Sequence, residues 1–172
     1  MLTRQAILDL FPAQRAGTVP PANVQTFIGE LGAFAVLRLT PSATLIAMTA
    51  TYAAVANWTS SDSRGSSAWT LSTTAGTITV PVDDWYQVGF CSVHAPAAAA
   101  GTVTARPFVN GVVVPGIQTG STGFPGVVPF GALSFAAPVS LLAGQVVDLR
   151  TNIDVPQNVN VGPAMFWLAR ML

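Results

Sequence analysis

Charged side chains are scarce in this sequence, and lysine is missing altogether. Only 8% of the 172 residues are charged, whereas about a quarter of the residues of an ordinary soluble domain carry a charge. All seven basic residues are arginines, scattered singly, and the net charge is zero. The missing lysine excludes a Walker-type phosphate loop and a Schiff-base enzyme. The scattered arginines form no basic patch, so we expect no nucleic-acid partner.

A surface with so few charges predicts that copies of the chain, a larger assembly or a membrane cover much of it. The uncharged stretch between Arg38 and Asp62 is long enough to cross a bilayer as a helix, but Pro41 and many Thr and Ser residues interrupt it. A longer uncharged stretch, from Pro107 to Val147, is too rich in Gly and Pro for a helix. Low charge is therefore a property of the whole chain, and we expect no membrane partner.

Cysteine and histidine occur once each, as Cys91 and His94. One cysteine excludes an internal disulfide. Residues three apart on a strand point to opposite faces, so these two form no catalytic pair. Zinc needs three or four ligands, more than these two residues supply, and there is no G-x-S-x-G elbow. We predict no enzyme, no cofactor and no metal. Asp83-Asp84 could hold calcium or hydrolyse a glycoside, but a solvated turn is the simpler interpretation.

The first 33 residues carry helical rather than strand patterns. After Pro20-Pro21 and before Gly32, apolar residues recur at the spacing of one helix face, namely Val24, Phe27, Ile28 and Leu31. Helices this short are not stable alone, so they must dock on the chain's own core or on a neighbouring subunit. We predict that residues 1–33 form an anchoring arm.

From residue 34 onward the patterns are those of strands. Ile78, Val80 and Val82 alternate with other residues at period two, and Asn110-Gly111 is a strong hairpin signal. We expect strands at 34–39, 44–55, 69–71, 77–82, 85–94, 102–109, 112–114, 132–137, 139–142, 146–152 and 165–172, with loops at 59–67 and 116–131. No helical pattern separates these strands, which favours an all-β antiparallel sandwich or barrel and excludes a parallel α/β sheet.

Four motifs between residues 76 and 172 resemble, in order, those of the C1q and tumour-necrosis-factor superfamily. They are Ile78-Thr-Val-Pro-Val followed by Trp85-Tyr86-Gln-Val-Gly-Phe; Val109-Asn110-Gly111; Val139-Ser-Leu-Leu-Ala-Gly144-Gln-Val-Val-Asp-Leu; and Phe166-Trp-Leu-Ala-Arg-Met-Leu. Asp84 stands where the family usually has Gly, and Gln145 where it usually has Asp. The first strands, residues 34–70, match only loosely.

The resemblance implies a jelly-roll sandwich for residues 34–172 and a homotrimer whose axis is lined by apolar and aromatic side chains. The candidates for that interface are Tyr86, Phe90, Phe166 and Trp167. Bacterial and phage relatives of this fold are usually surface attachments. We therefore hypothesise a structural virion protein, a capsid decoration or head-fibre protein of a bacteriophage. It would lie on the capsid exterior, with its arm docked on the major capsid protein or another shell protein.

The alternative is a trimeric fibre tip or bacterial surface module that binds a host receptor or glycan. Trp58 and Trp69 flank the polar stretch 59–67, and aromatic rings beside a polar loop are typical of sugar-binding surfaces. We therefore take these two residues as the candidate ligand surface.

Overall fold

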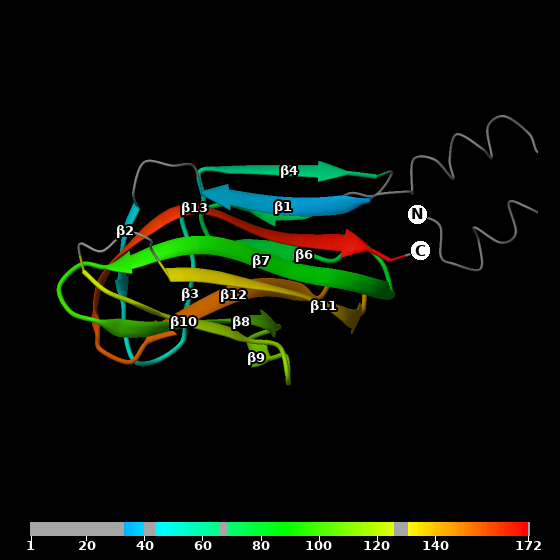
Figure 1. The fold of residues 1–172 in the computed structure, drawn as a ribbon. Coiled ribbons are helices and arrows are strands. Elements are labelled where there is room, and N and C mark those ends of the chain that lie inside the picture. The colour runs from blue at the N-terminus through cyan, green and yellow to red at the C-terminus, as the bar shows by residue number, and fades with distance from the viewer. Residues whose placement is uncertain (1–32, 40–43, 66–68, 126–130, 172) are drawn as a thin grey trace, which may run out of the picture.

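The described part of the molecule is built from strands that form two stacked antiparallel sheets (Figure 1). The computed structural model describes residues 33–39, 44–65, 69–125 and 131–171. The helical arm expected from Val24, Phe27, Ile28 and Leu31 lies outside these residues. No helix in the described ranges is long and apolar enough to cross a membrane.

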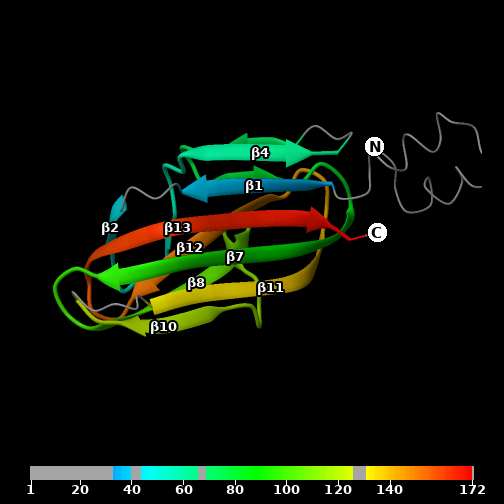
Figure 2. The same cartoon turned by 45° about the horizontal axis from the view of Figure 1, so that its top comes forward.

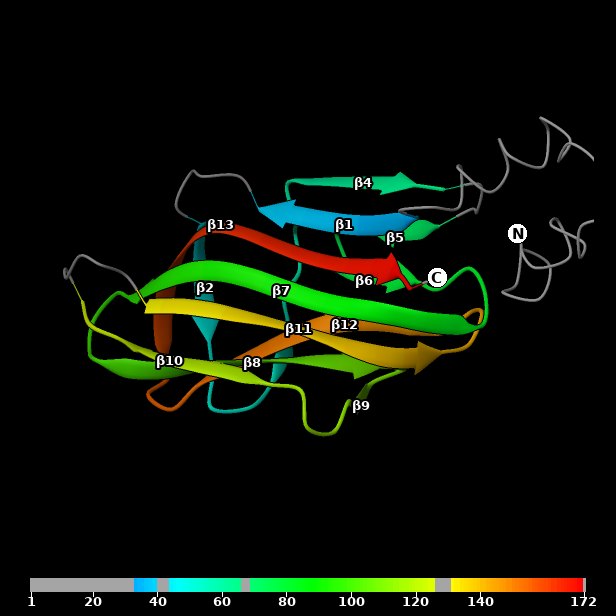
Figure 3. The same cartoon turned by 45° about the vertical axis from the view of Figure 1, so that its right-hand side comes forward.

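Sheet A has the strand order β11-β7-β13-β1-β4, and β2 pairs with one end of β13. Its strands are β1 (Phe34–Leu39), β2 (Thr44–Met48), β4 (Ser60–Arg64), β7 (Asp84–Pro96), β11 (Gly131–Leu141) and β13 (Gln157–Arg170). Figure 3 shows this sheet from its broad side, with β7 and β13, two of its longest strands, at its centre.

Sheet B has the order β10-β8-β12-β6-β5, with β3 on β12 and β9 on β8. Its strands are β3 (Ala53–Ala54), β5 (Thr70–Ser72), β6 (Thr77–Thr79), β8 (Gly101–Val109), β9 (Val112–Val113), β10 (Thr119–Gly123) and β12 (Val146–Ile153). Asn110 and Gly111 both have positive φ, and Val109 pairs with Val112. This is the predicted Asn-Gly hairpin.

The core lies between the two sheets because every second residue of the long strands is apolar and points inward. In β12, Val147, Leu149 and Ile153 are fully buried, and in β13, Phe166 and Leu168 are fully buried. Complete burial of one such side chain contributes about 1.5–3 kcal/mol. The period-two pattern read from the sequence therefore places the sandwich core correctly.

Several predicted boundaries were wrong. The expected loop 59–67 contains β4, whose polar residues pair with β1 at the edge of sheet A. The expected loop 116–131 contains β10, which pairs with β8. Pro138 does not split β11, because in that strand it pairs with Gln87 and points outward. The last strand begins at Gln157 and carries an irregularity between Val161 and Ala164.

Strand β1 starts and β13 ends at the same end of the sandwich (Figure 2). The two strands are antiparallel neighbours, and the Arg170 N–H donates to the Ala33 carbonyl oxygen at 2.9 Å. The chain that precedes residue 33 therefore joins the sandwich beside its C-terminal end.

Candidate interaction surfaces

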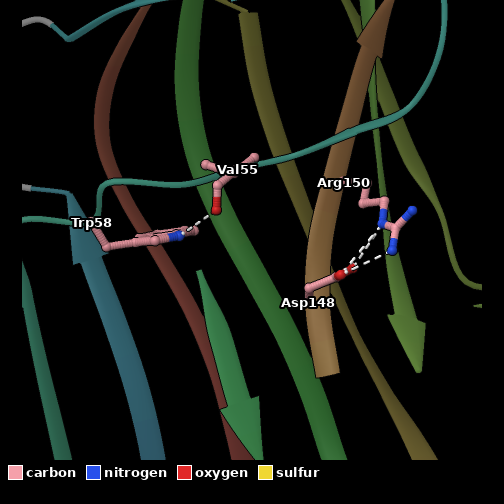
Figure 4. Close-up of polar contacts among 4 residues, drawn as sticks. All are labelled: Val55, Trp58, Asp148 and Arg150. Atoms are coloured by element: carbon pink, nitrogen blue, oxygen red, sulfur yellow. Dashed lines mark hydrogen bonds and ion pairs between the residues drawn. The ribbon is translucent and has the colours of Figure 1, made fainter. Parts of the chain in front are cut away.

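Trp58 is a core residue, which corrects its assignment to a ligand surface. Only 4% of it is exposed, and its indole N–H donates to the Val55 carbonyl oxygen at 2.7 Å (Figure 4). Trp69 is half-buried, donates to the Arg64 carbonyl oxygen at 3.2 Å and sets its ring edge-on to Tyr86 at 5.8 Å. The two tryptophans therefore do not form a platform together, and a ligand role for Trp69 stays a prediction.

Three of the four residues expected at a trimer interface point into the core instead. Tyr86, Phe90 and Phe166 are buried between the sheets, so they cannot line an interface, and their assignment is corrected. The Tyr86 hydroxyl donates to the Val82 carbonyl oxygen at 2.9 Å. Burial raises the pKa of Tyr86 to about 12. Of the four candidates, Trp167 is the one that lies on the outer face of sheet A.

The outer face of sheet A is a broad, nearly apolar surface. Directly paired residues of antiparallel strands share a face, so the register gives the rows across the sheet. One row runs Val36, Trp167, Gly89 and Ala136 from β1 to β11. The next row runs Arg38, Met165, Cys91 and Ser134, and a third runs Phe34, Ala169, Gln87 and Pro138.

Trp167 occupies the centre of this face because Gly89 leaves room for it. A Cβ at Gly89 would lie 2.1 Å from Cζ2 of the Trp167 ring. Beside the indole is a shallow groove of about 330 Å³. The groove is lined by Phe34, Val36, Arg38, Met165, Trp167 and Ala169. Met165 is 41% exposed, so the face presents apolar surface to its surroundings.

The charged residues that the described strands place on this outer face lie at the edge formed by β1 and β4. The Arg38 guanidinium lies 4.0 Å from the Asp62 carboxylate, and Arg64 lies 5.8 Å above the Phe34 ring. The outward residues of β13, β7 and β11 in the three rows carry no charge. We name this surface, centred on Val36, Met165 and Trp167, the apolar face.

The Asp83-Asp84 pair is engaged in contacts that hold the fold. Asp83 Oδ1 accepts from the Ala143 N–H at 2.7 Å. Asp84 Oδ2 accepts from Nε of the buried Arg170 at 2.6 Å, and its Oδ1 accepts from the Trp85 N–H. Within the described ranges, no group of three or more His, Cys, Asp or Glu residues is placed to hold a metal. These bonds give the acidic pair a structural role at one end of the sandwich.

Cys91 and His94 point to opposite faces of β7, as predicted. Cys91 is on the apolar face, whereas His94 is buried, and its Nε2 lies 3.2 Å from the Ser121 carbonyl oxygen. A carbonyl can only accept, so Nε2 carries the proton, and Nδ1 is a buried acceptor that has no partner among the residues that the structure describes. Burial lowers the pKa of His94 below its ordinary value, against the opposing effect of the Ser121 bond. The folded protein therefore holds His94 neutral.

On sheet B, Asp148 and Arg150 form an ion pair along one strand. Arg150 Nε lies 3.0 Å from Asp148 Oδ1, and its terminal nitrogen is 3.1 Å from Oδ2 (Figure 4). The same guanidinium lies 4.3 Å above the Phe108 ring. The charge of Arg150 is thus balanced on its own strand.

No protein-family model matches the chain, and no curated protein matches it. Solved structures do. The globular domain of a zebrafish complement 1qA protein superposes with a TM-score of 0.52 at 13% identity, over 81% of this chain and 98% of that one. Murine APRIL gives 0.51 at 10% identity, over 80% and 99%. The Eiger TNF of S. frugiperda gives 0.53 at 10% identity, over 81% and 94%. At sequence identities this low, the structural similarity shows a shared fold.

Proposed function

The chain has the C1q/TNF-like jelly-roll fold, and on that premise we propose that it is a non-enzymatic structural protein that acts as a homotrimer. The observation that carries the proposal is the apolar face of sheet A. Trp167 and Met165 stand on it beside a groove of about 330 Å³, and the charges of its described residues lie at the β1–β4 edge.

Second copies of the chain are the occupants that fit this face best. Soluble monomers rarely leave a large contiguous apolar patch in water. The chain carries only 8% charged residues, so a partner rich in charge would find few counter-charges here. Three copies around one axis bury the same patch three times in a closed assembly, which stops growth at the trimer. The proposed interface residues are Met165 and Trp167, in place of the buried Tyr86, Phe90 and Phe166.

We assign the trimer to a virion surface, as a decoration or head-fibre protein of a bacteriophage capsid. The support is the combination of a low-charge head with a short apolar pattern at Val24, Phe27, Ile28 and Leu31. This arm pattern directly precedes the sandwich, and three arms on one trimer bind a shell with multiplied strength. The partner is the major capsid protein or another shell protein.

The arm is tested by two matched substitutions in the full-length chain. Phe27→Asp places a charge on the predicted apolar helix face, and Thr26→Asp places the same charge on the opposite face. Both variants should keep the wild-type mass in solution. We expect only the Thr26→Asp protein to co-sediment with capsids stripped of the wild-type protein. Wild-type co-sedimentation of Phe27→Asp would contradict the anchoring role.

The second candidate function is a trimeric tip that binds a host receptor or glycan. The observation that favours it is a groove on the outer face of sheet B beside Arg106. This groove is on the sheet opposite the apolar face, so a trimer that buries the apolar face leaves it accessible.

A further inference from the structure

Two arginines stand side by side on the outer face of sheet B, each against an aromatic ring. Arg106 of β8 pairs directly with Arg150 of β12. The Arg106 guanidinium lies 5.0 Å above the Tyr52 ring, and Arg150 lies 4.3 Å above Phe108. The centroids of the two rings are 6.0 Å apart. Stacking on an aromatic face restricts a guanidinium to one orientation, so its N–H groups are pre-oriented for a ligand.

The two arginines differ in how their charge is balanced. Arg150 is held by the Asp148 carboxylate through both Nε and a terminal nitrogen. Among the described residues, Arg106 has no carboxylate within ion-pair distance. One terminal nitrogen of Arg106 donates to the Gln118 side-chain oxygen, and its buried Nε has no acceptor within the described ranges. A guanidinium that is held in one orientation on a ring and has no carboxylate beside it is a group that an anionic ligand can pair with.

A groove of about 260 Å³ adjoins Arg106. Its polar members are Arg106 and Gln118, and its walls are the short stretch Val113, Val114, Pro115, Gly116 and Ile117. Pro115 and Ile117 offer C–H surface, while Gln118 supplies an amide that can both donate and accept. The groove therefore presents one cation, one amide and an apolar wall within a space that suits a single small ring.

We propose that this groove binds a monosaccharide that carries a carboxylate, as the terminal residue of an acidic glycan. The carboxylate takes the charge-assisted hydrogen bonds of Arg106, whose planar fork matches a carboxylate. The sugar hydroxyls bond to Gln118, and the C–H face of the pyranose lies against the Pro115–Ile117 wall. The size of the groove favours one ring over a peptide, which needs a longer track. This site rests on the second candidate function and specifies its ligand as an acidic glycan. It requires only that the outer face of sheet B is open.

The test uses the full-length protein and saturation-transfer difference NMR, with sodium glucuronate as the probe and glucose as its neutral match. We expect glucuronate to bind at least about tenfold more tightly than glucose, because glucose leaves the Arg106 charge unpaired. Arg106→Gln should weaken glucuronate binding by about tenfold or more. Arg64→Gln removes a guanidinium that also stacks on an aromatic ring, on the other sheet. That variant should bind glucuronate as the wild type does.

Three further measurements distinguish an acidic sugar from other anionic ligands. Arg106→Lys keeps the charge without the fork, and it should bind more weakly than the wild type and more tightly than Arg106→Gln. Acetate that binds as tightly as glucuronate would reduce the site to one for a bare anion and overturn the sugar assignment. A glutamate-rich peptide that displaces glucuronate at lower concentration would overturn it in favour of a protein partner. Equal binding of glucose and glucuronate, or unchanged binding by Arg106→Gln, would overturn the site altogether. None of these results bears on the mass of the assembly or on capsid attachment by the arm.

Discussion

The Trp167 indole occupies the space in which a side chain at Gly89 would stand. A Cβ at Gly89 would lie 2.1 Å from Cζ2 and 2.2 Å from Cε2 of the indole. The strands β7 and β13 thus depend on each other at the centre of the apolar face. Because Gly89 of β7 has no side chain, the Trp167 ring of β13 can pack across that strand. This relationship sets the shape of the proposed interface.

Gly89→Ala should therefore displace Trp167. The ring cannot remain at 2.1 Å from a methyl carbon, so it must leave its position, at a cost of about 1–3 kcal/mol. We expect a lower midpoint of urea unfolding and a smaller fraction of trimer at equal protein concentration. Gly120→Ala is the matched control, because its Cβ would meet its nearest atom, Thr104 Oγ1, at 3.4 Å. If both variants unfold and assemble like the wild type, Trp167 does not depend on Gly89.

Trp58 should behave as a core residue in unfolding experiments. Trp58→Ala removes a side chain that is 4% exposed, and such truncations cost about 3–5 kcal/mol. Trp58→Phe keeps most of the volume but leaves the Val55 carbonyl without its donor, at a cost of about 1–3 kcal/mol. Urea unfolding followed by circular dichroism measures both. Unfolding free energies within about 0.5 kcal/mol of the wild type would place Trp58 on the surface after all.

The stability of the fold should decrease as the pH falls below about 6.5, because His94 is kept neutral. Burial lowers the pKa of His94 below its ordinary value of 6.5. At a pH between the two pKa values, His94 is therefore protonated in the unfolded chain and neutral in the folded chain. The contribution of neutral His94 is complete above pH 6.5 and is lost as the pH falls toward the folded pKa. The loss is at most about 1.4 kcal/mol for each pH unit in this window.

His94 is the single histidine, so the effect can be isolated with one variant. His94→Gln can still donate to the Ser121 carbonyl and does not titrate. Thermal melting between pH 7 and pH 5.5 should show a falling midpoint for the wild type and a nearly constant one for His94→Gln. Equal pH slopes for the two proteins would mean that His94 titrates in the fold as it does in the unfolded chain.

A charge placed on the apolar face should break the assembly without unfolding the chain. Met165 is 41% exposed, so Met165→Glu leaves the core intact while it puts a carboxylate into the proposed interface. Val112→Glu adds the same charge at a position that is 69% exposed on the β8–β9 hairpin of sheet B. Chemical cross-linking should yield trimers for Val112→Glu and almost none for Met165→Glu. Trimers from both variants would move the interface to another surface.

The sequence could predict those parts of the fold that depend on local patterns. Alternation around Val147 and Leu149 identifies a half-buried strand within a few residues, and Asn110-Gly111 specifies its own turn. Strand β4 could not be predicted in this way, because Ser60–Arg64 has the composition of a loop. Its strand conformation comes from pairing with β1, which is distant pairing that no local pattern encodes.

The candidate site was harder to predict because both faces of sheet A are apolar. Period-two spacing shows that Tyr86 and Phe90 share a face of β7, but the opposite face carries Trp85, Cys91 and Val93. Hydrophobicity alone cannot decide which set points inward. The burial of Trp58 depends on the hydrogen bonds of its neighbours to distant segments, such as the Thr59 N–H to the Arg38 carbonyl oxygen. Among the residues chosen from the sequence, Trp167 is the one that lies on the proposed interface.

In the proposed trimer, the apolar face is buried against two further copies of the chain. Light scattering after size exclusion gives the absolute mass of the purified full-length protein directly. We expect about 53 kDa, three times the chain mass of 17.8 kDa, for the wild type, and about 17.8 kDa for Met165→Glu. A wild-type protein that elutes as a stable 17.8 kDa monomer across the accessible concentration range would contradict the proposed trimer.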